Sequence, residues 1–127
     1  MIKKLFEVLS SKQKGGLAES LAEKYLKAQG FKIIAKNFRT KQGEIDLIAM
    51  KKDLLVFVEV KADFQGLDFI AEEKIDQRKI RKIFGVAEEF LFKNSKNLSK
   101  IKNIRFDVVV IRGEEVFHYE DAFQKDV

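Results

Sequence analysis

Apolar residues recur at helical spacing in two long stretches of the chain. From Leu17 to Gln29 they fill about half of a helical wheel, and Gly30 stands where a left-handed residue usually ends a helix. The second stretch has apolar residues at i, i+3, i+4, i+7 and i+11, namely Ile80, Ile83, Phe84, Ala87 and Leu91. This spacing predicts two amphipathic helices.

Short strand-like runs lie between these helices and after them. They are rich in Val, Ile, Leu and Phe, and they cover residues 31–38, 44–50, 54–61, 104–111 and 116–119. The order is therefore α, β, β, β, α, β, with one further short strand at the end. A mixed sheet flanked by helices is the packing expected for this order, so the fold class is predicted to be α/β.

The first residues of the chain also have helical spacing. Ile2, Leu5 and Leu9 predict a short amphipathic helix within residues 1–14, which ends near Gly15. Such a helix can pack on the domain or help two copies of the chain to associate.

Length and composition limit the classes of protein to consider. A chain of 127 residues, of which 46% are hydrophobic, fits a single domain over residues 1–127. No stretch approaches the roughly 20 consecutive apolar residues that span a bilayer, so no membrane association is expected. The chain has no cysteine, which excludes a cysteine nucleophile and a thiolate zinc site and suits a cytoplasmic protein.

Three acids and a lysine stand at the ends of two consecutive predicted strands. Side chains alternate along a strand, so Glu44 and Asp46 are expected on one face of theirs, and Glu59 and Lys61 on one face of theirs. A two-residue loop at 52–53 would place Asp46 opposite Glu59 and Glu44 opposite Lys61. All four residues then converge.

This convergence favours a metal site over a purely structural sheet. Opposed carboxylates repel each other, and a divalent cation held by Asp46 and Glu59 would relieve that repulsion. Such an ion with a nearby lysine is suited to phosphodiester hydrolysis, because both stabilise charge on the phosphate. The plain alternative is a cross-strand ion pair of Glu44 with Lys61, with the other two acids in water.

Several motifs along the chain resemble those of a known protein family. They are Glu19 to Leu26, Gly30-Phe31, Asn37-Phe38-Arg39, Gly43 to Ile48, Val56 to Lys61, Arg105 to Val109 and Asp121-Ala122-Phe123. Together they resemble the YraN family, small bacterial proteins that are themselves similar to PD-(D/E)XK nucleases. The resemblance implies a restriction-endonuclease-like core with Mg²⁺ as cofactor, or Mn²⁺ in its place.

The resemblance also assigns roles to the charged residues. Asp46 would be the central metal ligand, Glu59 the second acid and Lys61 the lysine of the terminal motif. Glu19 would be the acid from the first helix, with a place at the metal. Glu44 remains a further member of the catalytic site.

Two positions depart from the family pattern. Ala18 stands where a glycine usually precedes the acid of the first helix, and Ala62-Asp63 replaces a basic residue that often follows the terminal lysine. A carboxylate at Asp63 should weaken attraction for a phosphate backbone. This supports a second reading, in which the chain is a nucleic-acid-binding or protein-binding module with weak or no catalysis on a nuclease fold.

Positive charge is concentrated near the second helix. The chain has 25 Lys and Arg against 20 Asp and Glu, and the start of that helix carries Lys74, Arg78, Lys79, Arg81 and Lys82. Cations there oppose the helix macrodipole, so contact with nucleic-acid phosphates would explain them. The alternative is local neutralisation by Glu72, Glu73 and Asp76. Arg39 is a further candidate for nucleic-acid contact.

The prediction for function is a metal-dependent nuclease that hydrolyses phosphodiester bonds in DNA, including branched or damaged DNA. A homodimer is an expected arrangement, since cutting both strands suits a symmetric pair. His118, the one histidine, is expected to be a surface or packing residue, and zinc chemistry is not expected.

Overall fold

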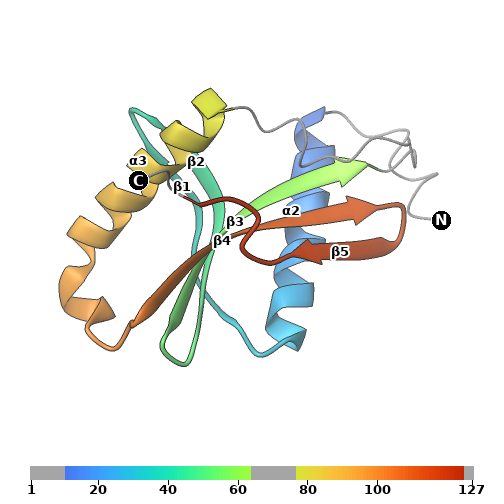
Figure 1. Ribbon diagram of the computed structural model, residues 1–127. Helices are drawn as coiled ribbons and strands as arrows, with labels where there is room; N and C mark the ends of the chain where they lie inside the picture. The colour runs from blue at the N-terminus through green and yellow to red at the C-terminus, as the bar shows by residue number, and fades with distance from the viewer. Residues whose placement is uncertain (1–10, 64–76, 125–127) are drawn as a thin grey trace.

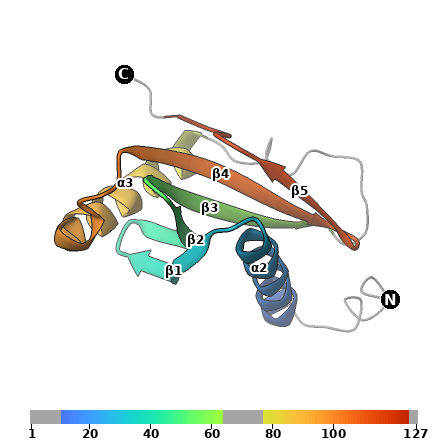
Figure 2. The ribbon, with the colours of Figure 1, turned by 90° about the horizontal axis from the view of Figure 1, so that it is seen from below.

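The fold is a five-stranded mixed sheet with helices on both faces (Figure 1 and Figure 2). The computed structural model describes residues 11–63 and 77–124. The strands are β1 (Lys32–Thr40), β2 (Gly43–Lys51), β3 (Leu54–Asp63), β4 (Asn103–Arg112) and β5 (Glu115–Tyr119). The helices are α2 (Ser11–Ala28), α3 (Gln77–Lys93) and the 3-10 helix η2 (Ser95–Leu98).

The strands lie in the sheet in the same order as in the chain. Three neighbouring pairs, β1 with β2, β2 with β3 and β4 with β5, are antiparallel. Strands β3 and β4 are parallel, so the chain must cross over between them, and α3 lies in that connection. The predicted α/β class and the order α, β, β, β, α, β with a final short strand are confirmed.

The central strands carry apolar residues on both faces because each face is covered by a helix. Val56 and Val58 of β3 pack in the cluster that contains Ala22 of α2. Leu55 and Phe57 point the other way, into the cluster that contains residues of α3. The alternation of buried residues along β3 therefore fills two separate cores, one under each helix.

Helix α2 is longer at its N-terminal end than its apolar pattern predicted. The prediction that one helix ends near Gly15 and another begins at Leu17 is wrong, because α2 starts at Ser11 and runs through Gly15 and Gly16. Glycine lowers helix stability by about 1 kcal/mol but does not block the helix. Nothing lies within 4 Å of a Cβ atom placed at either glycine. Residues 1–10, where the predicted first helix begins, lie outside the described part.

Glycine ends α2 as predicted. Gly30 has φ +96°, and the N–H of Phe31 donates to the carbonyl of Leu26 at 3.0 Å. This left-handed residue turns the chain back along the sheet edge into β1.

Candidate functional site

The register of β2 against β3 decides which acids meet. Lys51 pairs with Leu54, as the two-residue loop predicted, and the pairing continues as far as Leu47 with Val58. The next residues along the two strands are Asp46 and Glu59. The regular pairing of β2 with β3 therefore ends one residue before Asp46 and Glu59.

Asp46 occupies a break in the regular pleat of β2. Ile45 and Ile48 both pack in the α3-side cluster, whereas strict alternation would put them on opposite faces. The Oδ2 atom of Asp46 accepts a hydrogen bond from the N–H of Val60 at 2.8 Å. In a regular ladder, a backbone carbonyl of the neighbouring strand would accept this bond. The predicted pairs Asp46–Glu59 and Glu44–Lys61 therefore both lie beyond the regular ladder.

The backbone of β1 is irregular beside the same point. Lys36 pairs with Leu47 and Phe38 with Ile45, which leaves Asn37 beside Asp46. Asn37 has φ +50°, a left-handed conformation that costs energy in most residues and is common only for Gly, Asn and Asp. Such strain tends to occur at functional sites, where surrounding contacts maintain it.

Asp46 lies among other acids. Burial, and after it the negative charges of Glu59, Glu19 and Glu44, raise its pKa to about 7, although the hydrogen bond from Val60 acts in the opposite direction. Four carboxylates from α2, β2 and β3 are thus close enough to affect one another's charge. The strand register had suggested Glu44, Asp46 and Glu59 for this set, and the family resemblance had suggested Glu19.

Glu59 holds two lysines. Its side chain is 9% exposed, and its Oε1 atom lies 3.1 Å from Nζ of Lys79 and 3.7 Å from Nζ of Lys61. Burial and the neighbouring Lys79 lower the pKa of Lys61, against the effect of Glu59. Burial also lowers the pKa of Lys79, but its contacts with Lys61 and Glu59 outweigh this and leave it raised.

Lys79 is a member of the site that sequence reasoning had placed only among nucleic-acid contacts. The spacing of Lys79 from the apolar residues of α3 indicates where it lies. Lys79 precedes Ile83 by four residues and Val86 by seven, so it lies on the buried face of α3. A lysine on the apolar side of an amphipathic helix needs an acid to pair with, and Glu59 is that acid.

Glu19 reaches the site from α2. Burial raises its pKa, as do the charges of Glu44 and Glu59, whereas a hydrogen bond with Asn37 lowers it. One turn farther along, Glu23 pairs with Lys36 of β1 at 3.0 Å. This ion pair joins α2 to β1 near Glu19, and the buried Ala18 and Ala22 pack the same helix on the sheet.

Glu44 pairs with Arg39 instead of Lys61. The distance from Arg39 Nη2 to Glu44 Oε2 is 3.2 Å across β1 and β2. The plain alternative of a Glu44–Lys61 ion pair is therefore not formed. The Arg39 side chain is 74% exposed, so it is available at the surface beside the acids.

Asp63 does not present the open charge that the sequence suggested. It is buried, with 5% of its surface exposed, and its Oδ2 atom lies 3.1 Å from Nε of Arg112. Positions 63 and 112 pair in the parallel β3–β4 ladder, which explains the contact. The expectation that Asp63 weakens attraction for phosphate is corrected, because Arg112 offsets its charge.

The other predicted basic residues lie on α3. Arg78, Arg81 and Lys82 are exposed on the outer side of the helix. Lys74 lies outside the described residues. The three exposed cations share the helix that delivers Lys79 to the acids.

The donor set suits a cation that needs few protein ligands. Among the described residues, no three acid or histidine side chains form a ready metal cage. Within residues 11–63 and 77–124, Asp46 Oδ1 and Glu59 Oε2 have no hydrogen-bond or ion-pair partner. Mg²⁺ commonly takes one or two carboxylates and completes its shell with water, so two such oxygens fit it.

Comparison with known proteins identifies similar chains in many bacteria. Residues 18–111 match the model of the uncharacterised protein family UPF0102. A UPF0102 protein of Sulfurihydrogenibium is 45% identical over 111 residues, which is 87% of this chain and 94% of the relative.

Two further relatives come from other bacteria. A UPF0102 protein of Fervidobacterium nodosum is 46% identical over 115 residues, 88% of this chain and 83% of the relative. One of Clostridioides difficile is 38% identical over 117 residues, 91% of this chain and 100% of the relative. In the described part of the chain, neither long helix is apolar enough to cross a membrane.

Proposed function

The chain belongs to the uncharacterised protein family UPF0102, the YraN family, and we propose that it is a metal-dependent nuclease that hydrolyses phosphodiester bonds in DNA. The observation that carries the proposal is the environment of Asp46. A half-buried aspartate whose pKa is raised to about 7 stands among three other acids, with two lysines at one of them. Carboxylates whose pKa is strongly shifted by burial and by neighbouring charges cluster at functional sites.

A divalent cation would be held by Asp46 and Glu59, with Glu19 in reach from α2. When bound, Mg²⁺ or Mn²⁺ supplies positive charge that offsets the charge building up on the phosphate and acidifies water beside it. The same positive charge would stabilise the ionised form of Asp46, which burial and its acidic neighbours disfavour in the free protein.

Lys61 is the residue proposed to handle a proton. Its lowered pKa makes the neutral amine easier to reach, and a neutral amine can accept a proton from the water that attacks the phosphate. Lys79 keeps its proton more firmly and contributes fixed positive charge. Glu59 holds both amines and so sets their positions relative to the acids.

DNA would approach over α3 and the β1–β2 edge. Arg78, Arg81 and Lys82 line the outer side of the helix and Arg39 lies beside Glu44, so phosphates on either side of the cut would meet cations. The proposal includes a restriction-endonuclease-like core, a branched or damaged DNA substrate, a homodimer and a cytoplasmic location.

The test is DNA cleavage by purified protein. Linear, single-stranded, flap and four-way-junction DNA are incubated with Mg²⁺ or Mn²⁺, beside Asp46→Asn and Lys61→Ala. Glu114→Gln, a change in the exposed β4–β5 turn, is the matched control. We expect chelator-sensitive cleavage by the wild type and the control but not by the two site variants. Equal cleavage by all four proteins would refute the catalytic role.

A second candidate is a DNA-binding module without useful catalysis. The lack of a three-ligand cage among the described residues favours it, as does the engagement of Glu59 by two lysines. Binding of the same DNAs without cleavage, at an affinity that chelator does not alter, would select this candidate. Calorimetric titration with Mg²⁺ and Mn²⁺ tests metal binding without any DNA.

A further inference from the structure

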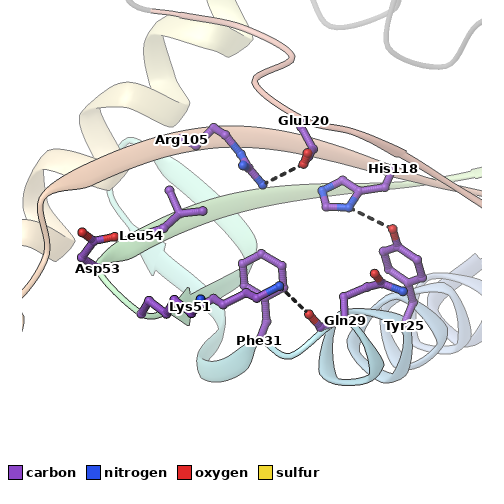
Figure 3. Close-up of a pocket in the computed structure, with 10 residues that line it drawn as sticks. Tyr25, Gln29, Phe31, Lys51, Asp53, Leu54, Arg105, His118 and Glu120 are labelled. Atoms are coloured by element: carbon purple, nitrogen blue, oxygen red, sulfur yellow. Dashed lines mark hydrogen bonds and ion pairs between the residues drawn. The ribbon is translucent and has the colours of Figure 1, made fainter.

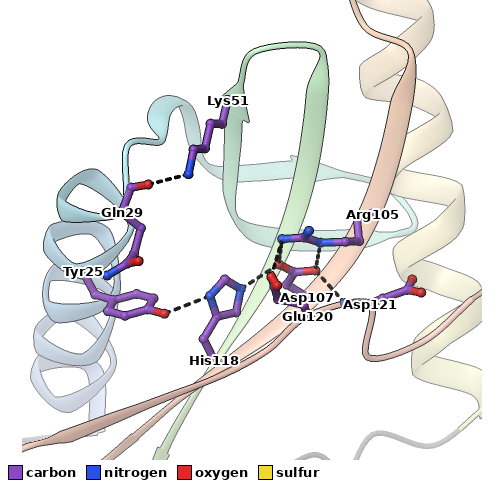
Figure 4. Close-up of polar contacts among 8 residues, drawn as sticks. All are labelled: Tyr25, Gln29, Lys51, Arg105, Asp107, His118, Glu120 and Asp121. Carbon is purple, nitrogen blue, oxygen red and sulfur yellow. Dashed lines mark hydrogen bonds and ion pairs between the residues drawn. The ribbon is translucent and has the colours of Figure 1, made fainter.

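A second polar cluster connects α2 with the last two strands (Figure 4). Its centre is Asp107 of β4, whose side chain is fully buried. His118 lies beside it because β5 pairs with β4 in the register Val109 to His118. Tyr25 approaches His118 from the helix, with the two rings edge to face at 5.5 Å between centroids.

The carboxylate of Asp107 determines which ring nitrogen of His118 is protonated. It accepts two bonds from Arg105 at 2.8 Å each, one from the backbone N–H of Asp121 at 2.9 Å, and one from Nε2 of His118 at 2.6 Å. Burial acts to raise the pKa of Asp107, but these bonds from His118, Arg105 and Asp121 leave it lowered. An ionised carboxylate only accepts, so Nε2 of His118 is the protonated nitrogen.

The other ring nitrogen faces Tyr25. The Tyr25 hydroxyl lies 3.1 Å from Nδ1 of His118. While His118 is neutral, Nδ1 is an acceptor, and the hydroxyl must donate its hydrogen to it. If His118 takes up a proton at Nδ1, the N–H donates instead, and the hydroxyl hydrogen of Tyr25 is released. One proton thus changes the Tyr25 hydroxyl from an acceptor into a donor toward its surroundings.

Those surroundings are a pocket of about 610 Å³ beside the β2–β3 turn (Figure 3). Cations line it, namely Lys51 and Lys52 from the turn and Arg105 from β4, together with Tyr25 and His118. Two acids, Asp53 and Glu120, lie on its wall. The volume falls within the range of small-molecule sites.

Two of the cations are already held in place. The Nζ atom of Lys51 donates to the carbonyl of Gln29 at 2.9 Å and lies 5.5 Å from the centroid of the Phe31 ring. Arg105 is fixed by Asp107 and lies 3.6 Å from Glu120. Each group retains N–H hydrogens beyond these contacts, so the pocket has donors from three sides that need little rearrangement.

We propose that this pocket binds a small molecule through a phosphate-type oxyanion, and that binding is coupled to proton uptake by His118. The donors would be Lys51, Lys52 and the released hydroxyl of Tyr25. Donors that arrive from a turn and a helix suit a tetrahedral anion, which has oxygens in several directions. The site is independent of the acids at Asp46.

The charged groups around His118 set the direction of the coupling. They are Tyr25 from α2, Arg105 and Asp107 from β4, and Glu120 and Asp121 after β5. Arg105 and Asp107 offset each other, so a proton on His118 adds positive charge near the pocket. An anion and a proton therefore favour each other's binding, as linkage requires.

The experiment is a titration of the full chain with sulfate, whose charge stays constant, at several pH values between about pH 8 and about pH 6. Constant ionic strength is kept with chloride, and amide NMR spectra locate the site. We expect shifts at Tyr25, Lys52 and His118, and an apparent Kd that falls by up to about tenfold per pH unit as the pH decreases. Parallel titrations with phosphate and acetate should show tighter binding of phosphate.

Variants separate the pocket from the proton relay. Tyr25→Phe and His118→Gln should remove the pH dependence of sulfate affinity, whereas Lys52→Ala should weaken binding severalfold and keep the pH dependence. Lys41→Ala, an exposed lysine outside the pocket, is the control and should match the wild type. Thermal melting verifies that each variant is folded, and either relay variant alone suffices if the other is not. Sulfate shifts elsewhere in the chain, no binding, or unchanged pH dependence in the folded relay variants would each overturn the proposal.

Discussion

The Nζ atom of Lys79 lies 3.1 Å from Oε1 of Glu59, so the helix after β3 places an amine on an acid of that strand. The contact joins α3 to the part of β3 that lies beyond its regular pairing with β2. It also brings Lys79 close to Lys61, which shares the same carboxylate. The pKa of Lys61 is lowered and that of Lys79 is raised, so Lys61 loses its proton more readily than Lys79 does.

Removal of Lys79 should shift the pH profile of the cleavage rate to higher pH. The positive charge of Lys79 helps to lower the pKa of Lys61, so Lys79→Met raises that pKa and leaves less neutral amine at a given pH. We expect cleavage near neutral pH to be about tenfold slower, less than the about 10²- to 10⁴-fold cost of losing proton transfer completely, and to recover as the pH rises. Lys93→Met, an exposed change at the C-terminal end of the same helix, is the control. An unshifted pH profile in Lys79→Met would contradict the role given to Lys61.

Asp46→Asn should make the protein more stable while it removes cleavage. The pKa of Asp46 is raised to about 7 in the folded chain, against 3.8 ordinarily. The folded state therefore binds this proton more tightly than the unfolded state does. The stabilisation that this tighter proton binding gives the folded state is fully present below the ordinary pKa of 3.8. It is lost as the pH rises toward 7.

At about pH 8 the ionised Asp46 thus destabilises the wild type, and the neutral amide should raise the free energy of unfolding by about 1 to 2 kcal/mol. The carbonyl of the new side chain can still accept the N–H of Val60. Urea unfolding at about pH 8 and at about pH 4 measures the difference, which should shrink at the lower pH. Mg²⁺ should stabilise the wild type and not the variant. A less stable variant at the higher pH would contradict the assigned pKa shift.

The sequence predicted the elements well because they follow local rules. The strand β3, the glycine after α2 and the two-residue turn at 52–53 each depend on neighbouring residues, and each is found as predicted. The run through Gly15 and Gly16 was missed because glycine costs a helix only about 1 kcal/mol and so does not by itself end one.

The site was predictable only up to the point where regular geometry ends. Counting along ideal strands brought Asp46 and Glu59 to adjacent positions, since the turn fixes the register. It could not show the break at Asp46, because a side-chain bond to Val60 replaces a backbone bond there. The pairing of Asp63 with Arg112 was likewise hidden, because parallel strands 49 residues apart in sequence give no local signal.

The Asp63–Arg112 pair should matter more for stability than for cleavage. Arg112→Ala would leave a buried carboxylate without this partner, so we expect a loss of about 2 kcal/mol or more in unfolding free energy. Asp63→Asn in the same chain should restore part of it, because no charge then remains buried. Thermal or urea unfolding of the single and double variants measures the coupling. Equal destabilisation in the single and double variants would show that the charge of Asp63 is not the cause.

The exposed cations of α3 should act through DNA phosphates. Arg78, Arg81 and Lys82 are solvent-exposed, so each alanine change should alter the free energy of unfolding by less than about 0.5 kcal/mol. If each contacts a phosphate, its removal should weaken binding to all DNA sequences alike and reduce the slope of log affinity against log salt by about 1.

The measurement is fluorescence anisotropy with labelled DNA across a series of salt concentrations, in the presence of Ca²⁺ or chelator to limit cleavage. Lys96→Ala, an exposed lysine of η2, removes the same charge away from α3 and should leave the slope unchanged. If the control lowers the slope as much as the α3 variants do, net charge alone would explain binding. In that case α3 would not be the DNA-facing element, and the approach of DNA over this helix would have to be abandoned.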